Sequence, residues 1–178
     1  MTHLPISGAI RGLQVEAATA GGRVQVHLAG LDDFRVSLSS TYYDETPEET
    51  MAGDLGRAVR LLSARREDAV RRAGLHSDVT LVAGSRLAQE LADFNRESDE
   101  WSTEVVAPDR CVRASTVGMR EFVVEIEPGT RRRHSVTTFC DIAGRVGSEL
   151  IRERVQATMR QRMEYARREQ DARALGLL

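Results

Sequence analysis

Arginine is the residue type in this chain with the clearest chemical potential, because the chain has 25 basic residues and none of them is lysine. A guanidinium presents a rigid fork of donors that matches the oxygens of phosphate or carboxylate in pairs. The arginines gather in two stretches, with six in residues 57–73 and fourteen in residues 110–178. Both stretches carry more arginines than acidic residues, whereas residues 1–56 and 74–109 are acidic. This pattern favours binding of an anionic partner by the basic stretches.

Phosphate contacts made by arginines produce binding that is sensitive to salt and independent of nucleotide sequence. The candidate nucleic-acid-binding residues are Arg65, Arg66, Arg71 and Arg72 on a first helix, Arg160, Arg162, Arg167 and Arg168 on a last helix, and Arg131, Arg132 and Arg133 on a predicted hairpin tip. Two helices that present such rows about one groove apart could clamp a DNA duplex. The alternative is that the rows are solvated helix faces, balanced by neighbouring glutamates.

Nothing in the sequence indicates an enzyme. The chain lacks the Gly-x-Ser-x-Gly elbow, the Gly-x-x-x-x-Gly-Lys phosphate loop and the His-Glu-x-x-His zinc motif. Cys111 and Cys140 are expected to be buried, unpaired residues of a cytoplasmic protein, and no spacing of cysteine and histidine suits zinc. The sequence therefore predicts a non-enzymatic protein without a cofactor or a metal.

Composition indicates a globular chain with no membrane segment. The 178 residues are 41% hydrophobic and 29% charged, with few aromatic residues. No run approaches the ~18 apolar residues that a membrane helix needs, and the N-terminus has no signal peptide pattern. We therefore expect a cytoplasmic location.

An internal repeat organises the chain. The stretch Val15–Gly21 resembles Val112–Gly118 at an offset of 97 residues, and each stretch is followed by alternating apolar residues, a turn and an arginine-rich helical pattern. Such a repeat indicates two similar units in one chain. The alternative is a single domain whose two halves look alike by chance.

The alternation and capping patterns predict an α+β fold. In residues 1–76 we expect strands at Leu13–Thr19, Arg23–Leu28 and Phe34–Ser40, and a helix from Thr46 to Ala73. In residues 77–178 we expect a helix at Val79–Arg96, a loop at Ser98–Glu104, strands at Arg110–Val117, Glu121–Glu127 and Arg133–Cys140, and a helix at Gly147–Ala172. The expected architecture is two pseudo-symmetric units, each a β-meander plus helix, in which amphipathic helices pack on antiparallel sheets.

The unit built from Gly21–Leu28, a turn, Arg35–Leu38 and a following helix resembles the YbaB/EbfC family. The resemblance covers residues 13–73, with a weaker echo over 79–172. It implies a three-stranded sheet flanked by helices, and a bacterial nucleoid-associated protein that binds DNA weakly and without sequence preference. Members of that family usually dimerise, which implies either a homodimer or one chain that carries both halves. The first unit departs from the family pattern because no helix precedes its sheet.

Proteins attached to type VII (ESX) secretion loci of actinobacteria are similar in the same unit. Tyr165 and Glu169 also match the loose Tyr-x-x-x-Asp/Glu pattern of that pathway. This second resemblance implies a protein-interaction or scaffold module that uses a sheet edge or the region of Trp101. A third hypothesis is a small ligand bound in a cavity between the two units.

Overall fold

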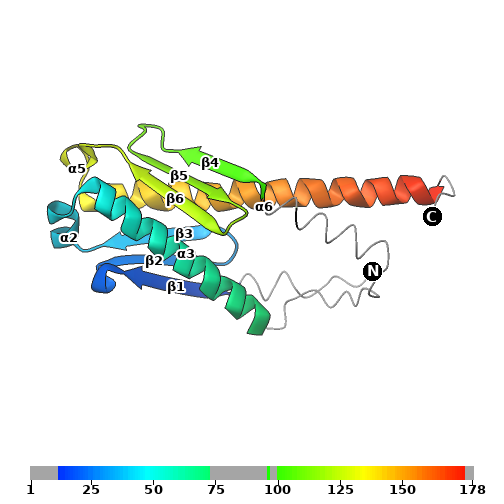
Figure 1. Cartoon of the computed structure of the whole chain (residues 1–178), viewed down its shortest axis with the longest axis horizontal. Coiled ribbons are helices and arrows are strands. Elements are labelled where there is room, and N and C mark those ends of the chain that lie inside the picture. The colour runs from blue at the N-terminus through cyan, green and yellow to red at the C-terminus, as the bar shows by residue number, and fades with distance from the viewer. Residues whose placement is uncertain (1–11, 73–95, 97–99, 175–178) are drawn as a thin grey trace.

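The computed structural model describes residues 12–72, 96 and 100–174, with side chains beyond Arg160 only at Met163 and Arg167. The fold is α+β and repeats one element order twice (Figure 1). The first series is β1 (Gln14–Thr19), β2 (Val24–Ala29), β3 (Asp33–Leu38), α2 (Ser40–Glu45) and α3 (Glu48–Arg72), with a short 3-10 turn, η1 (Ala20–Gly22), between β1 and β2. The second series is β4 (Ser102–Val106), β5 (Val112–Val117), β6 (Glu121–Ile126), α5 (Thr130–Arg133) and α6 (Val136–Ala174).

Each series begins with a three-stranded antiparallel meander, in the orders β1-β2-β3 and β4-β5-β6. Val15 pairs with Leu28, and Leu28 pairs with Phe34 on the far strand. Alternate residues of the central strands are buried, which puts one apolar face of each sheet against the helices. The period-two alternation therefore predicted five of the six strands close to where they lie.

The three strands and the long helix of the two series begin 88 residues apart. Strands β2 and β5 begin at Val24 and Val112, β3 and β6 begin at Asp33 and Glu121, and α3 and α6 begin 88 residues apart as well. The turn hydrogen bonds follow the same offset, because Gly30 N donates to the carbonyl of residue 13 over 2.8 Å and Gly118 N donates to that of residue 101 over 3.0 Å. The offset of 97 expected from the sequence is wrong, since it aligned the edge strand β1 with the central strand β5.

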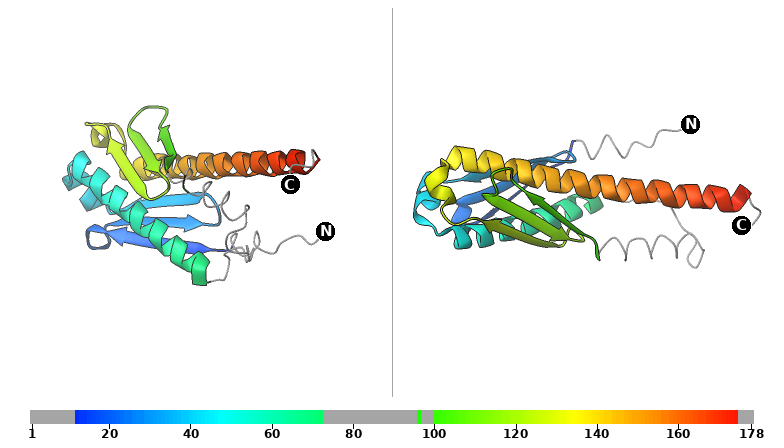
Figure 2. Two further views of the ribbon diagram at one scale, coloured as in Figure 1. Left: turned by 45° about the vertical axis from the view of Figure 1, so that its right-hand side comes forward. Right: turned by 90° about the horizontal axis from the view of Figure 1, so that it is seen from above.

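Each long helix packs on its own sheet and also on one strand of the other sheet (Figure 2). Helix α3 packs on β1 and β2 of its own sheet and on β6 of the other, while α6 packs on β4 and β5 and on β3. Helix α3 meets the edge of the opposite sheet through Gly56, where a Cβ atom would lie 3.6 Å from the carbonyl oxygen of Phe122. The equivalent Gly144 of α6 meets the carbonyl oxygen of Phe34, at 3.2 Å. A Cβ atom at position 56 would make an ordinary van der Waals contact, whereas one at position 144 would be tight against the strand backbone. The two contacts join the two series into one structure.

At equivalent positions, a polar side chain of each long helix donates a hydrogen bond to the edge strand of the opposite sheet. Arg60 Nη1 donates to the carbonyl oxygen of Phe122 over 2.9 Å, and Ser148 Oγ donates to that of Phe34 over 3.3 Å. One continuous core lies between the sheets and the two long helices. The ring of Tyr43 in α2 lies 5.3 Å from that of Phe139 in α6, between ring centroids, so the core joins the series at this end too.

Three expectations about elements are wrong. The segment Arg133–Cys140 is not a strand, because Ser135 Oγ accepts a hydrogen bond from Thr138 N and α6 begins at Val136 instead of Gly147. The expected loop at 98–104 contains the start of β4, and the chain after β3 forms the short helix α2. The predicted helix at 79–96 falls outside the described residues, except for Arg96. The proposed boundary near residue 76 falls outside them too, so the division into two units stays a prediction.

Helix α6 extends beyond both sheets in all three views (Figures 1 and 2). It has 39 residues and is therefore about 58 Å long at 1.5 Å per residue. Helix α3 has 25 residues. Within the described residues, α6 is thus the longer of the two long helices.

Candidate functional site

The eleven candidate arginines lie in three separate places. Arg131, Arg132 and Arg133 form most of α5, so they are not on a hairpin tip as expected. Arg65, Arg66, Arg71 and Arg72 lie in the C-terminal half of α3, and Arg160, Arg162, Arg167 and Arg168 lie in the C-terminal part of α6. Figure 1 shows α5 at one end of the long axis of the molecule and the end of α6 at the other. The fold therefore does not bring all eleven arginines to one surface.

Two of the α5 arginines are already engaged, Arg131 with the first series and Arg133 within the second. Arg131 Nη1 donates to the carbonyl oxygen of Asp44 over 2.8 Å, and its Nε lies 3.4 Å from Glu48 Oε1. Arg133 forms an ion pair with Glu127, and this carboxylate raises the pKa of Arg133. Because these guanidiniums already have anionic or carbonyl partners, binding a phosphate would cost the fold those contacts. Only Arg132 of this trio is exposed without such a partner among the described residues.

The arginines of α3 are also mostly engaged. Arg65 Nη1 donates to the carbonyl oxygen of Glu16 over 2.6 Å, and Arg72 pairs with Asp68 one turn away. Arg66 is partly buried, and burial lowers its pKa. Arg71, in the last turn, is exposed. Among the described contacts of α3, Arg65 and Arg72 are engaged and Arg66 is partly buried, whereas Arg71 is exposed.

Helix α6 changes character along its length. Near the sheets, Arg152 Nε donates to Asp32 over 2.9 Å, and the buried Arg154 guanidinium lies 5.0 Å above the Trp101 ring. Toward the C-terminal end of α6, Met159, Met163 and Arg167 are exposed at a spacing of four residues, and Arg160 is exposed next to Met159. We call these four residues the outer face of α6. The side chains of Arg162 and Arg168 lie outside the described set.

The outer face of α6 combines two kinds of group. Met159 and Met163 are 54% and 65% exposed, which is unusual for large apolar side chains. Arg160 and Arg167 are exposed beside them. Such a face can bind an anionic surface through its guanidiniums or an apolar surface through its thioethers.

The cavity between the sheets is small. It is about 60 Å³ in volume and is lined mainly by apolar residues, among them Phe34, Leu62, Met119, Val123 and Ile151. Small-molecule sites usually occupy a few hundred Å³ or more. The hypothesis of a small ligand between the units therefore receives little support from the volume of this cavity.

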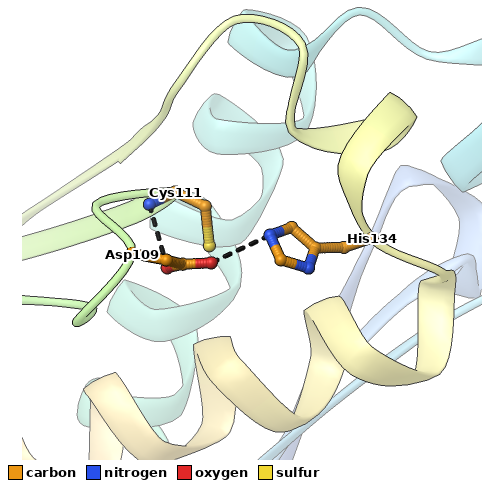
Figure 3. Close-up of side chains that lie close together, drawn as sticks. All are labelled: Asp109, Cys111 and His134. Carbon is orange, nitrogen blue, oxygen red and sulfur yellow. Dashed lines mark hydrogen bonds and ion pairs between the residues drawn. The ribbon is translucent and has the colours of Figure 1, made fainter.

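One cluster of reactive side chains was not anticipated from the sequence. Asp109, Cys111 and His134 converge where the β4–β5 turn meets the end of α5 (Figure 3). Asp109 Oδ2 lies 2.8 Å from His134 Nε2, and Asp109 Oδ1 accepts a hydrogen bond from Cys111 N over 3.2 Å. The spacing of a cysteine and a histidine 23 residues apart matches no motif. Only the fold brings the three residues together.

The electrostatics of this cluster argue against a nucleophilic cysteine. Burial, followed by the hydrogen bond to Asp109, raises the pKa of Cys111 to about 12. The pKa of Asp109 is lowered, with the hydrogen bond from the Cys111 side chain as the main cause. The thiol is therefore protonated at neutral pH, whereas nucleophilic attack requires the thiolate.

Comparison of the chain with protein-family models, with curated proteins and with solved structures found no match. Within the described residues, no helix is both long enough and apolar enough to cross a membrane.

Proposed function

We propose that this chain is a non-enzymatic DNA-binding protein that contacts the phosphate backbone weakly and without reading sequence. The observation that carries the proposal is the outer face of α6, where Arg160 and Arg167 are exposed on a helix that extends beyond the sheets. The resemblance of residues 13–73 to nucleoid-associated proteins of the YbaB/EbfC family points the same way. The proposed interface is narrower than the eleven arginines considered at first.

The physical argument rests on local charge, since the whole chain has a formal charge of −2. Arginines on a projecting helix can approach a duplex without bringing the acidic parts of the body to it. Each phosphate that an arginine neutralises releases condensed counterions, so affinity falls as salt rises. The binding is expected to be weak because few arginines take part.

The test is fluorescence polarisation with a random-sequence 30-mer duplex, begun at low salt and titrated upward. In the double variant Arg160→Gln/Arg167→Gln, the slope of log K against log salt is expected to decrease by about 2, roughly one per lost contact. The matched control is Arg132→Gln/Arg145→Gln, which removes two exposed charges near the opposite end of the molecule. Undetectable binding by the intact chain at about 50 mM salt would contradict the proposal.

A second candidate is a protein-interaction module that uses the same face. It is favoured by the exposure of Met159 and Met163, and by the pairing of many other arginines with carboxylates. The partner would be an amphipathic helix with an apolar stripe flanked by acidic residues, because that pattern complements methionines beside arginines. A second copy of the chain belongs to the same class of partner.

One double variant distinguishes the two candidate functions. Met159→Gln/Met163→Gln is expected to leave DNA binding unchanged if phosphate contacts carry the function. The same change would abolish association with a protein partner or with a second copy, measured by light scattering coupled to size-exclusion chromatography. Loss of association with retention of DNA binding would assign the methionines to a protein interface.

A further inference from the structure

We propose that Asp109, Cys111 and His134 form a zinc site. Their ligand atoms, a carboxylate oxygen, Sγ and Nε2, all lie within 4.8 Å of one another. Figure 3 shows the three side chains pointing into a common space from two separate segments. A tetrahedral zinc ion with bonds of about 2.0–2.3 Å needs ligand atoms about 3.3–3.6 Å apart. The Asp109–His134 contact of 2.8 Å would therefore open by about 0.5 Å when the ion enters.

The donor set selects the class of metal. A thiolate and an imidazole are soft to borderline ligands, which suit zinc and its neighbours and not magnesium or calcium. On binding, the zinc–sulfur bond replaces the S–H bond of Cys111, and the thiol proton passes to solvent. One dipositive ion with one thiolate, one carboxylate and one neutral imidazole leaves no net charge at a partly buried position. Such neutrality lowers the cost of placing the ion there.

The backbone holds the donors in place before any ion arrives. The carbonyl oxygen of Cys111 accepts hydrogen bonds from Glu127 N over 3.0 Å and from Thr130 Oγ1 over 3.4 Å. His134 is the C-cap of α5, and its backbone N–H donates to the carbonyl oxygen of Thr130 over 3.0 Å. Thr130 thus connects the two ligand-bearing segments. A site organised in this way loses little conformational entropy on binding.

The first series of the molecule serves as an internal comparison. The positions 88 residues earlier hold Gly21, Arg23 and Thr46, none of which ligates zinc. Thr46 nevertheless caps α2 as His134 caps α5, with its N–H bonded to the carbonyl oxygen of Tyr42. The fold therefore makes this junction without the cluster. The aspartate, cysteine and histidine are an addition to the second series that the shared architecture does not require.

The site would have an open coordination position. Cys111 is fully buried, but the side chains of His134 and Asp109 are 18% and 39% exposed, so the ion would face solvent on one side. Three protein ligands and one exchangeable position differ from closed structural zinc sites, which have four protein ligands. Arg133, whose charge interacts with Asp109 and Cys111, is itself paired with Glu127. The open position would accept water or a donor from a partner.

The rival explanation is that the three side chains only form a hydrogen-bond network that fastens the β4–β5 turn to α5. Titration of the chelator-treated chain with Co²⁺ distinguishes the two. A zinc-type site predicts a near-ultraviolet charge-transfer band from a cobalt–thiolate bond at one ion per chain, displaced by Zn²⁺. Competition with a chromophoric chelator would then give the zinc affinity. Absence of that band in the intact chain, or zinc affinity no tighter than millimolar, would overturn the proposal.

Matched variants assign the ligands. Cys111→Ser and His134→Gln are expected to weaken zinc binding by at least about tenfold, the smallest effect usual even for residues around a metal site. Cys140→Ser and His27→Gln change the same residue types elsewhere and should leave binding unchanged. Circular dichroism verifies the folding of each variant. A cobalt–thiolate band that survives Cys111→Ser and disappears in Cys140→Ser would place the metal elsewhere and refute the assignment.

Discussion

Positions 56 and 144, and positions 60 and 148, make equivalent contacts in the two halves of the molecule. In each half a helical glycine and a polar side chain meet the carbonyl oxygen of a phenylalanine on the opposite sheet. Around these shared contacts the halves differ in chemistry. Residues Tyr42 and Asp54 form a buried hydrogen bond in the first half, whereas Thr130 and Ile142 occupy those positions in the second.

This comparison separates two kinds of residue. Positions that match at the offset of 88 maintain the packing of each long helix against both sheets. Positions that do not match carry features of one half alone, such as the Asp109–Cys111–His134 cluster. A functional residue is therefore better sought among the mismatched positions than among the matched ones.

Separating the halves would have the largest effect. The fragments 1–76 and 77–178 are each expected to be unfolded alone, because α3 and β3 lose the surfaces of β6 and α6 on which they pack. Mixing the two fragments should restore helical structure. Thermal unfolding followed by circular dichroism, with size-exclusion chromatography, measures both results. A cooperative transition in residues 1–76 alone would show that the first half is an independent domain.

The substitution Gly147→Ala tests a mismatch inside the shared packing. A Cβ atom at Gly147 would lie 2.2 Å from Cδ1 of Phe34, whereas the equivalent Val59 carries a branched side chain. We expect a loss of about 2–3 kcal/mol in the free energy of unfolding, as for overpacked cores. The matched control is Gly53→Ala in α3, where nothing lies within 4 Å, and where alanine should add about 0.5–1 kcal/mol. Equal effects in urea denaturation would contradict this account.

Removing the phenol of Tyr42 tests the buried network of the first half. Tyr42 Oη donates to Asp54 Oδ2 over 2.5 Å, and Arg57 pairs with the same carboxylate. Tyr42→Phe is expected to lower the free energy of unfolding by about 1–2 kcal/mol, since a buried carboxylate loses a donor. The double variant Tyr42→Phe/Asp54→Leu, which removes both partners of the buried hydrogen bond, should cost less than the sum of the single changes. Additive costs would show that the two residues are not coupled.

Alkaline pH should lower the free energy of unfolding. Burial is the main cause that raises the pKa of Tyr43 to about 12, from 10.0 in an unstructured chain. Because the folded state favours the neutral phenol, this contribution is complete below pH 10 and is lost as pH rises through 12. Cys111 acts in the same direction, from 9.0 to about 12.

The measurement is the free energy of unfolding in urea at several pH values between 8 and 12. Tyr43→Phe lacks the titrating group and should show a shallower decline above pH 10 than the intact chain. That variant also loses the bond from Tyr43 Oη to the carbonyl oxygen of His134, so its stability at pH 8 provides the baseline. An unchanged pH dependence would mean that Tyr43 does not contribute.

The strands that have regular alternation could be predicted from the sequence. Val24, Val26 and Leu28 alternate with polar residues and lie on the buried face of β2. The segment Val136–Cys140 misled the prediction, because valine, threonines and phenylalanine favour a strand by local preference. The capping hydrogen bond at Ser135 and the packing of Phe139 against Tyr43 make it the start of a helix instead.

The functional candidates were only partly predictable. The sequence identifies every arginine, but it does not reveal that Arg131 reaches the carbonyl oxygen of Asp44 or that Arg66 is partly buried. These contacts join residues that are far apart in the chain. Likewise, Asp109 and His134 meet only because the β4–β5 turn and α5 lie side by side, which no local pattern records.

The sequence by itself determined the α+β class, the first meander, strands β5 and β6 and the helix that starts at Glu48, because alternation and helix capping are local properties of the chain. The tertiary structure decided the place of β4, the offset of 88 between the halves, the packing of each long helix on both sheets, and which of the described arginines are engaged. These features depend on contacts between distant residues, such as Gly144 with the backbone of Phe34. The energy of such contacts exceeds the local preferences that the sequence displays, which is why only the fold reveals them.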